Sequence, residues 1–218
     1  MGGIFLNTIE RKELKGELKY KDTVILTYQI QYPEITSSPY ESGRKVFNQY
    51  NRQRALLLEN RVKTQLYQDA KDLYDYNTAN GYPVMVYEIV SQFTLTYQQD
   101  SIISLYNDQY EFTGGAHGNT IQTSQTWDLS LCQMFPLFYF YPDNPYYLLD
   151  ILQVIYAEIK RQNESGENQY FENYCELVLE TFRFENYYLT PTAIAIYFQQ
   201  YDIAPYSSGI PVFFIPYP

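Results

Sequence analysis

The sequence predicts an α+β protein. Strands and helices come in runs along the chain instead of alternating one by one, which is typical of this class. One long stretch in the N-terminal half has apolar residues at the three- and four-residue spacing of a helix, and most other segments alternate between apolar and polar residues as strands do. The predicted order is β-α-β-β-β-α-α-β-β-β, with antiparallel sheets packed against the helices.

The first strand and the first helix have clear patterns. Residues 17–32 alternate and are rich in β-branched and aromatic side chains, which predicts a strand. From about residue 40 to residue 80 the pattern is helical, and Gly81 followed by Pro83 ends this helix. The apolar residues of its predicted buried face are Ala55, Leu58, Val62, Leu66, Ala70 and Leu73.

The rest of the chain predicts a meander, two further helices and three short strands. Asn144 is a suitable cap for the second helix and Pro145 suits its first position, while residues 163–166 end it. A meander of adjacent antiparallel strands is expected because only short polar links separate its members. The expected strands are 84–97, 101–112, 121–131, 183–189, 193–198 and 209–215, and the third helix is 169–182.

Composition limits the classes of partner. The 218 residues carry a formal net charge of −10, with a pI of about 4.6. The dense lysine and arginine that neutralise phosphates are missing, so we expect no nucleic-acid partner and no anionic membrane surface. A basic protein is favoured because opposite charges speed encounter, although net charge also simply keeps a protein soluble. No apolar run approaches 18 residues and no leader pattern opens the sequence, so we expect neither a membrane span nor a signal peptide in it.

The cysteines and tyrosines give two further expectations. Cys132 and Cys175 are too few for a disulfide framework or a structural zinc site, and we expect them to be free and buried, with Cys175 on the apolar face of the third helix. The 26 tyrosines are an unusual number. Tyrosine suits sheets and cores, and also gives contact area at recognition surfaces at a low entropic cost. We expect most of them to fill the sheets and a minority to form a binding surface.

The glycine-rich segment at residues 113–119, TGGAHGN, holds the only histidine of the chain, His117. It has neither the Lys-Ser/Thr pair of a phosphate-binding loop nor a dinucleotide-binding setting, and no nucleophile motif accompanies His117. The favoured interpretation is structural: Gly114, Gly115 and Gly118 shape a tight strand crossing, and His117 with Asn119 organises the loop. A binding role for His117 and Asn119, or catalysis by His117 with a carboxylate, stays open as an alternative. The nearest candidate carboxylates are Asp108 and Glu111.

The C-terminal segment at residues 201–217 is rich in tyrosine and proline. Pro211 and Pro216 bracket a short apolar strand and favour an edge or strand-end position. An edge with exposed tyrosines is suited to recognition, and a packed structural loop is an equal alternative. The residues we expect to bind a partner here are Tyr201, Tyr206 and Tyr217.

Three separated motifs resemble a known family: FTGGAHGN (112–119), YLTP (188–191) and IAPYSSGIP…IPY (203–217). They look like the C-terminal extracellular domain shared by RsiV-type anti-sigma factors and PdaC-type peptidoglycan deacetylases of Gram-positive bacteria. The resemblance implies a C-terminal α+β domain over 99–218 and an N-terminal α+β partner region with one long helix over 1–98. It also implies an extracytoplasmic location, with the cytoplasm or a spore as alternatives.

The leading hypothesis is a non-catalytic module of the cell envelope. The resemblance implies that its partner is a cationic protein such as lysozyme, or a cell-wall glycan. A hydrolase of cell-wall material that uses His117 and a carboxylate is one rival, and a cytosolic or spore-associated structural protein is another. No catalytic residue, metal ligand or cofactor is expected.

Overall fold

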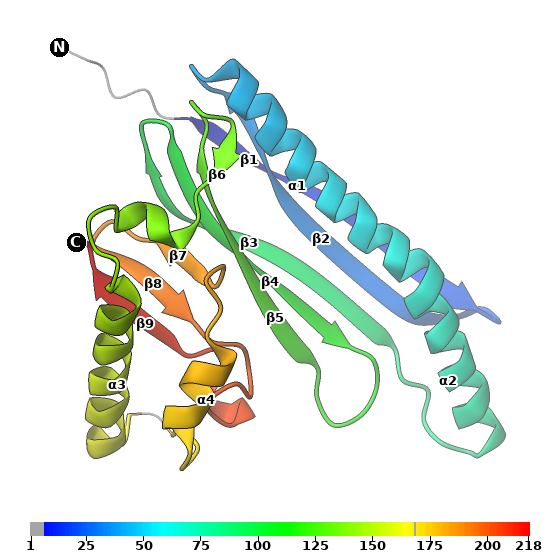
Figure 1. Ribbon diagram of the computed structural model, residues 1–218. Coiled ribbons are helices and arrows are strands. Elements are labelled where there is room, and N and C mark those ends of the chain that lie inside the picture. The colour runs from blue at the N-terminus through cyan, green and yellow to red at the C-terminus, as the bar shows by residue number, and fades with distance from the viewer. Residues whose placement is uncertain (1–6, 168) are drawn as a thin grey trace. The chain divides into compact units, whose positions relative to one another are not determined.

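The computed structural model describes residues 7–167 and 169–218, and the protein is α+β as predicted (Figure 1). The chain forms two compact units. Unit 1 contains residues 1–93, 107–120 and 129–132, and unit 2 contains residues 94–106, 121–128 and 133–218. None of the described helices combines the length and the apolar composition that a membrane crossing requires.

Sheet A has six strands in the order β1-β2-β3-β4-β5-β6. Strands β3, β4 and β5 contribute residues to both units. Residues Asp100 and Ser101 alone join β3 to β4, so these hydrogen-bonded neighbours run antiparallel, as the predicted meander requires. The strands are β1 (Thr8–Tyr20), β2 (Thr23–Ser37), β3 (Tyr87–Gln99), β4 (Ile102–Phe112), β5 (Asn119–Asp128) and β6 (Gln133–Met134).

The predicted first strand is in fact part of a hairpin, and this corrects the expected element order. Strands β1 and β2 pair antiparallel around the two-residue turn Lys21-Asp22. Both turn residues have positive φ, 47° and 64°, which is the backbone of a type I′ hairpin turn. The turn could not be recognised within the pattern of residues 17–32, because it contains neither glycine nor asparagine, the usual residues at positive φ.

The prediction of purely antiparallel sheets is also corrected, because β2 and β3 pair in parallel. A parallel pair needs a long crossover, and the helical segment between these strands supplies it. That segment runs without interruption through α1 (Glu41–Arg61), the π-helical turn η1 (Val62–Leu66) and α2 (Tyr67–Ala79), which confirms the predicted long helix.

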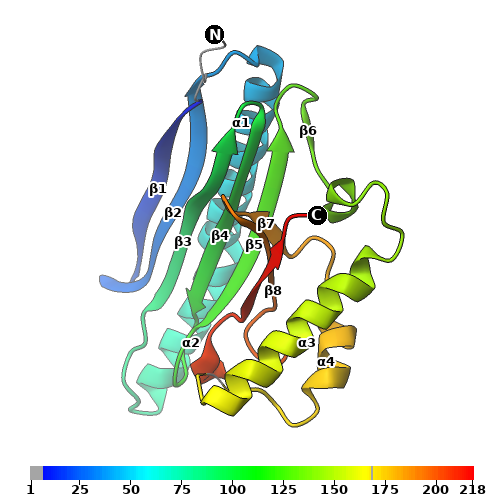
Figure 2. The same cartoon turned by 90° about the vertical axis from the view of Figure 1, so that its left-hand side faces the viewer.

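The long helix packs against β2 in unit 1 (Figure 2). Its buried side chains recur along one face, and strands β2 and β3 supply the other half of this core. Among the members of the core are Ile25, Leu26, Ile30, Ala55, Val62, Leu66, Ala70 and Ile89. All of the predicted apolar helix residues therefore face this core, with Leu58 and Leu73 partly buried at its margin.

Unit 2 is built on sheet B, whose strands β7 (Tyr187–Leu189), β8 (Ala193–Tyr197) and β9 (Val212–Pro216) pair antiparallel in that order. Helices α3 (Tyr147–Ser165) and α4 (Tyr174–Thr181) supply apolar side chains to its main core. Both are shorter than predicted at the N-terminus. The Asn144 side chain accepts a hydrogen bond from the N–H of Tyr146 at 2.9 Å, so it forms a turn that precedes α3. Gly166, with φ of 71°, ends α3 as expected.

The cysteines are free, but the expectation that both are buried is wrong. Cys132 is half-buried and Cys175 is exposed. Because α4 begins at Tyr174, Cys175 lies in its first turn, at an end of the helix that solvent reaches. The buried face of α4 is centred on Val178 instead.

A glycine in α1 gives the first testable prediction. A Cβ on Gly43 would lie 2.0 Å from the carbonyl oxygen of Leu129, so the Gly43→Ala variant must shift backbone. We expect its free energy of unfolding to fall by about 1–3 kcal/mol, although alanine is normally better than glycine in a helix by about 1 kcal/mol. Urea unfolding followed by circular dichroism measures the change.

The exposed neighbour Ser42 provides the control for this prediction. Ser42→Ala should leave the unfolding midpoint almost unchanged, because its side chain points away from the core. A Gly43→Ala protein as stable as the Ser42→Ala protein would show that the contact with Leu129 does not constrain α1.

Candidate functional site

The glycine-rich loop connects β4 to β5 and belongs to unit 1. Gly114 and Gly115 have positive φ, 95° and 98°, which side-chain-bearing residues rarely adopt. Gly118 has a different requirement, because a Cβ there would lie 2.5 Å from the ring of Tyr110. The sharp return of the chain after β4 thus needs all three glycines, two for their conformation and one for space.

The polar residues of this loop lie at the surface. His117 is exposed, and its Nδ1 lies 2.9 Å from the carbonyl oxygen of Gly118 and donates to it. Asn119 is exposed and is the first residue of β5. Neither side chain lines a described groove of unit 1.

The carboxylate of Glu111 is engaged in a structural ion pair. The Arg61 guanidinium contacts both of its oxygens, and the Nε2 atom of Gln109 donates to Oε1 at 2.6 Å. Burial alone would raise the pKa of Glu111, but the hydrogen bonds from Arg61 and Gln109 lower it overall. Glu111 is therefore held ionised between β4 and α1, where it stabilises unit 1.

The three predicted binding tyrosines belong to unit 2, so the structure separates them by unit from His117 and Asn119. Tyr201 is half exposed and has a positive φ of 68°. Its ring centroid lies 5.8 Å from that of Tyr206. Tyr217 is partly exposed, and its hydroxyl donates to the carbonyl oxygen of Thr190 at 2.6 Å. Tyr201 and Tyr206 thus form one aromatic pair, and Tyr217 lies by the β7–β8 turn.

Net charge is distributed very unevenly between the two units. Unit 2 contains twelve acidic and three basic residues, a formal charge of −9, whereas unit 1 contains thirteen acidic and twelve basic residues, a formal charge of −1. The excess of negative charge that the composition revealed is therefore a property of unit 2.

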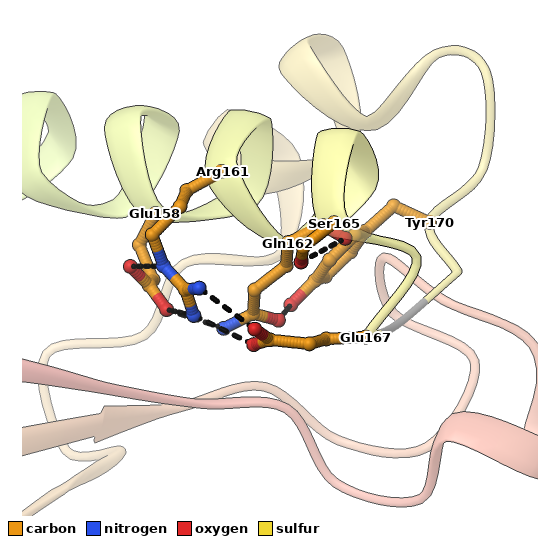
Figure 3. Close-up of polar contacts among 6 residues, drawn as sticks. All are labelled: Glu158, Arg161, Gln162, Ser165, Glu167 and Tyr170. Atoms are coloured by element: carbon orange, nitrogen blue, oxygen red, sulfur yellow. Dashed lines mark hydrogen bonds and ion pairs between the residues drawn. The ribbon is translucent and has the colours of Figure 1, made fainter.

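Arg161 on α3 is the centre of a polar network in unit 2 (Figure 3). Its guanidinium donates to both oxygens of Glu158, at 2.8 and 2.9 Å, and to both oxygens of Glu167, at 2.7 and 2.9 Å. Gln162 donates to Glu158 at 2.7 Å and accepts from the Tyr170 hydroxyl at 2.7 Å. The network ties the last turns of α3 to the segment that follows Gly166.

This network shifts the proton equilibria of its members. Hydrogen bonds from Arg161, and then from Gln162, lower the pKa of Glu158 to about 2. The Arg161 guanidinium also lowers the pKa of Glu167, and the two carboxylates raise the pKa of Arg161. All three side chains are therefore charged at neutral pH, and together they carry one net negative charge.

A groove of about 600 Å³ lies beside this network, between α3 and β9. One wall is a single face of α3, because its residues are spaced by three or four positions. The other wall is β9, whose Phe214 is 59% exposed. The lining residues are Val154, Ala157, Glu158, Arg161, Gln162, Val212, Phe213 and Phe214.

The expected edge position of the proline-bracketed strand is confirmed, because β9 is the last strand of sheet B. The α3 wall was not predicted. The spacing of Glu158 and Arg161 by three positions indicates an ion pair on a helix. Their position beside β9, some fifty residues further along the chain, follows only from the tertiary fold.

The described residues contain no cluster of side chains suited to binding a metal ion. No three of their His, Cys, Asp and Glu side chains converge in an arrangement that could hold a metal ion. What the structure offers is a helix–strand groove and exposed aromatic side chains on an acidic unit.

Comparison with known proteins identifies the family. A family model described as deacetylase PdaC matches residues 19–120, and the model of a protein family of unknown function, DUF3298, matches residues 140–218. The chain therefore has a PdaC/DUF3298-type domain of unknown function. PdaC membership indicates an association with the cell envelope and an extracytoplasmic location. No curated protein sequence matches the chain.

Two solved structures share the fold. A DUF3298 family member from Bacteroides fragilis has a TM-score of 0.66 and 19% identity, with 97% of this chain and 91% of that chain covered. A DUF3298 family protein from Pseudomonas aeruginosa has a TM-score of 0.58 and 18% identity, with 97% and 92% covered. At these identities the likeness establishes the arrangement of the chain, and the α+β class with it.

The Arg161 network predicts a pH dependence of stability. Because the pKa of Glu158 is lowered in the folded state, its ion pair stabilises the protein fully above the ordinary pKa of a glutamate. That stabilisation is lost as the pH falls from about 4.5 towards 2. The Arg161→Gln variant lacks the cause of the shift, so its Tm should fall less between pH 6 and pH 3 than that of the wild type. The difference should be small, since the side chain of Arg161 is half exposed.

Lys160 supplies the matched control. Its Nζ lies 3.9 Å from Glu164, and both side chains are largely exposed. Lys160→Gln removes the same charge from the adjacent position and should keep the wild-type pH dependence. Equal pH profiles for the Arg161→Gln and wild-type proteins would contradict the assigned role of the network.

Proposed function

We propose that this protein is a non-catalytic binding module of the bacterial cell envelope that recognises a cationic protein. The observation that carries the proposal is the charge of −9 on unit 2 beside an almost neutral unit 1. A charge needed only for solubility could be spread over the whole chain. Concentrated on one unit, it instead directs the approach of an oppositely charged partner.

The acidic residues around α4 support this proposal most directly. Glu172, Glu176 and Glu180 are exposed and follow one another at four-residue intervals. Glu176 and Glu180 lie on α4, where like charges four positions apart destabilise a helix slightly, and Glu172 precedes the helix. No ion pair within the described residues includes any of the three. A cationic partner would relieve this repulsion, which is a favourable term available only on binding.

Apolar side chains are exposed near these charges in the sequence. Leu179 is 61% exposed and Phe184 is 51% exposed. Exposed aromatic and aliphatic side chains surrounded by charged ones are the composition of a protein interface rather than of a purely solvated helix. Lysozyme, a cationic protein, is the partner that the family resemblance suggests for such a surface.

A cell-wall glycan is the second candidate ligand, and one observation favours it. The neighbouring rings of Tyr201 and Tyr206 form an aromatic pair, with Tyr201 half exposed. Aromatic rings at the surface supply the apolar faces on which a sugar ring can pack. The hydrolase alternative gains no comparable support, since Glu111 is already held by Arg61 and Gln109.

Isothermal titration calorimetry with lysozyme and with purified muropeptides tests the proposal. Binding of lysozyme should weaken steeply when the salt concentration is raised, because exposed charges are screened over about 8 Å at physiological ionic strength. Binding of muropeptides without lysozyme would favour the glycan alternative. The absence of heat with both would exclude the two named ligands.

Charge-neutral variants of the three glutamates around α4 give the third prediction. The triple variant Glu172→Gln, Glu176→Gln, Glu180→Gln should bind lysozyme more weakly by about 3- to 150-fold, as expected from roughly 0.2–1 kcal/mol for each of three exposed charges. The effect should be largest in low salt. The dissociation constant measured by calorimetry gives the change.

A matched triple variant in unit 1 separates local from overall charge. The control carries Glu17→Gln, Asp22→Asn and Glu88→Gln, three exposed positions of unit 1. It has the same net charge as the α4 variant and should bind as the wild type does. Equal weakening in both variants would show that total charge, and not the acidic surface of unit 2, controls binding.

A further inference from the structure

Strand β9 has a free hydrogen-bonding edge. It pairs with β8 on one side, and no further strand of the described chain follows it in sheet B. In antiparallel pairs every second residue directs its N–H and C=O away from the neighbouring strand. Such an edge is a template for another extended chain.

One hydrogen bond identifies the residues that face outward. The N–H of Phe198 donates to the carbonyl oxygen of Pro211 at 3.0 Å, so these two residues form a hydrogen-bonded pair. Along the register of β8 and β9, the next such pairs are Ile196 with Phe213 and Ile194 with Ile215. The backbone groups of the residues between them, Val212 and Phe214, therefore point to the free edge.

The edge is short and has a defined length. Pro216 lacks an N–H, so the template ends there, and Pro211 precedes the strand at its other end. Between the two prolines the edge offers the N–H and C=O of Val212 and Phe214, which is enough for a strand of a few residues. Both residues also line the groove between β9 and α3.

The groove supplies what an added strand needs besides backbone bonds. A chain lying along β9 would have α3 on its other side, with Val154 and Ala157 as an apolar surface and the Glu158–Arg161 ion pair as a charged one. Recognition of an extended segment between an edge strand and a helix gives affinity through main-chain bonds and specificity through alternate side chains.

We infer that β9 and α3 bind an extended segment of a partner protein, in which apolar and basic residues alternate. This inference rests on the proposed binding function and names its mode. The charge complementarity rests on unit 2 as a whole, which carries −9. The Glu158–Arg161 ion pair that lines the groove is neutral, and Glu167, which lies outside the lining and binds Arg161, adds one negative charge next to it.

Hydrogen exchange measured by NMR tests the inference directly, with the capped peptide acetyl-Lys-Val-Lys-Val-Lys-amide as the probe at about 1 mM. The amides of Val212 and Phe214 should exchange more slowly when the peptide is present. The amides of Phe213 and Ile215 already bond to β8 and serve as internal controls, so their exchange should not change. Absence of protection at Val212 and Phe214 would overturn the inference.

A proline substitution gives the fourth prediction. Phe214→Pro removes the outward N–H without removing a bond to β8, a change that edge strands tolerate. Phe214→Ala removes the same ring and keeps the N–H. We expect the proline variant to lose peptide binding at least tenfold relative to the alanine variant, with similar circular dichroism spectra for both. Equal binding by the two variants would overturn the inference.

Two further measurements, self-association of the chain and lysozyme binding, also test the edge inference. Protection of Val212 and Phe214 that grows with protein concentration in the absence of peptide would mean that a second copy of the chain occupies the edge, which overturns the inference. If lysozyme binds the wild type and the Phe214→Pro variant equally, the edge inference fails while the proposed function stands. If lysozyme fails to bind and the peptide still protects the two amides, the edge inference survives the loss of that ligand.

Discussion

The hydrogen bonds of the buried Ser104 hydroxyl hold sheet B against strands β4 and β5 within unit 2, and the arrangement of unit 2 depends on them. The Ser104 Oγ accepts a hydrogen bond from the N–H of Leu189 on β7 at 2.9 Å, and it shares a second hydrogen bond with the Thr126 hydroxyl of β5 at 2.8 Å. Ser104 is fully buried and Thr126 nearly so, hence neither hydroxyl has water as a substitute partner. Leaving such a group unpaired costs about 1–3 kcal/mol. Through this pairing the first strand of sheet B is fixed to β4 and β5, and β8 and β9 follow from it by their register.

The same contact makes the two edges of sheet B unlike. On the β7 side, the N–H of Leu189 is satisfied by Ser104, and the Tyr187 hydroxyl donates to the carbonyl oxygen of Phe135, so side chains and loops close this edge. On the β9 side, α3 lies alongside without supplying backbone partners, and the groove remains. Proteins usually cover or blunt their free edges. Here one edge is sealed by a buried hydroxyl and the other is left with a helix wall, which is why the binding inference concerns β9.

Elements whose cause is local could be predicted from the sequence, and elements whose cause is tertiary could not. The long helix follows from periodicity alone, and the edge position of β9 follows from Pro211 and Pro216, since proline cannot donate within a sheet. The hairpin was missed because Lys21 and Asp22 adopt positive φ without the glycine that usually marks such a turn. The groove could not be predicted from the sequence, because only the tertiary fold brings α3 and β9 together and no motif marks the helix face that lines the groove.

The charge of unit 2 and the short length of β9 together act against pairing of the free β9 edge with another copy of the same chain. A free edge that is long and neutral invites pairing with further copies of the same chain. The free edge of β9 ends at Pro216 and belongs to a unit with a formal charge of −9, so a second copy would bring the same charge to the contact. Repulsion between like charges acts against pairing of two copies of the chain, and attraction between opposite charges favours a basic segment. Specificity at this edge thus comes from excluding one partner as well as from attracting another. The acidic composition that first suggested a cationic partner thus also protects the edge at which that partner is inferred to bind.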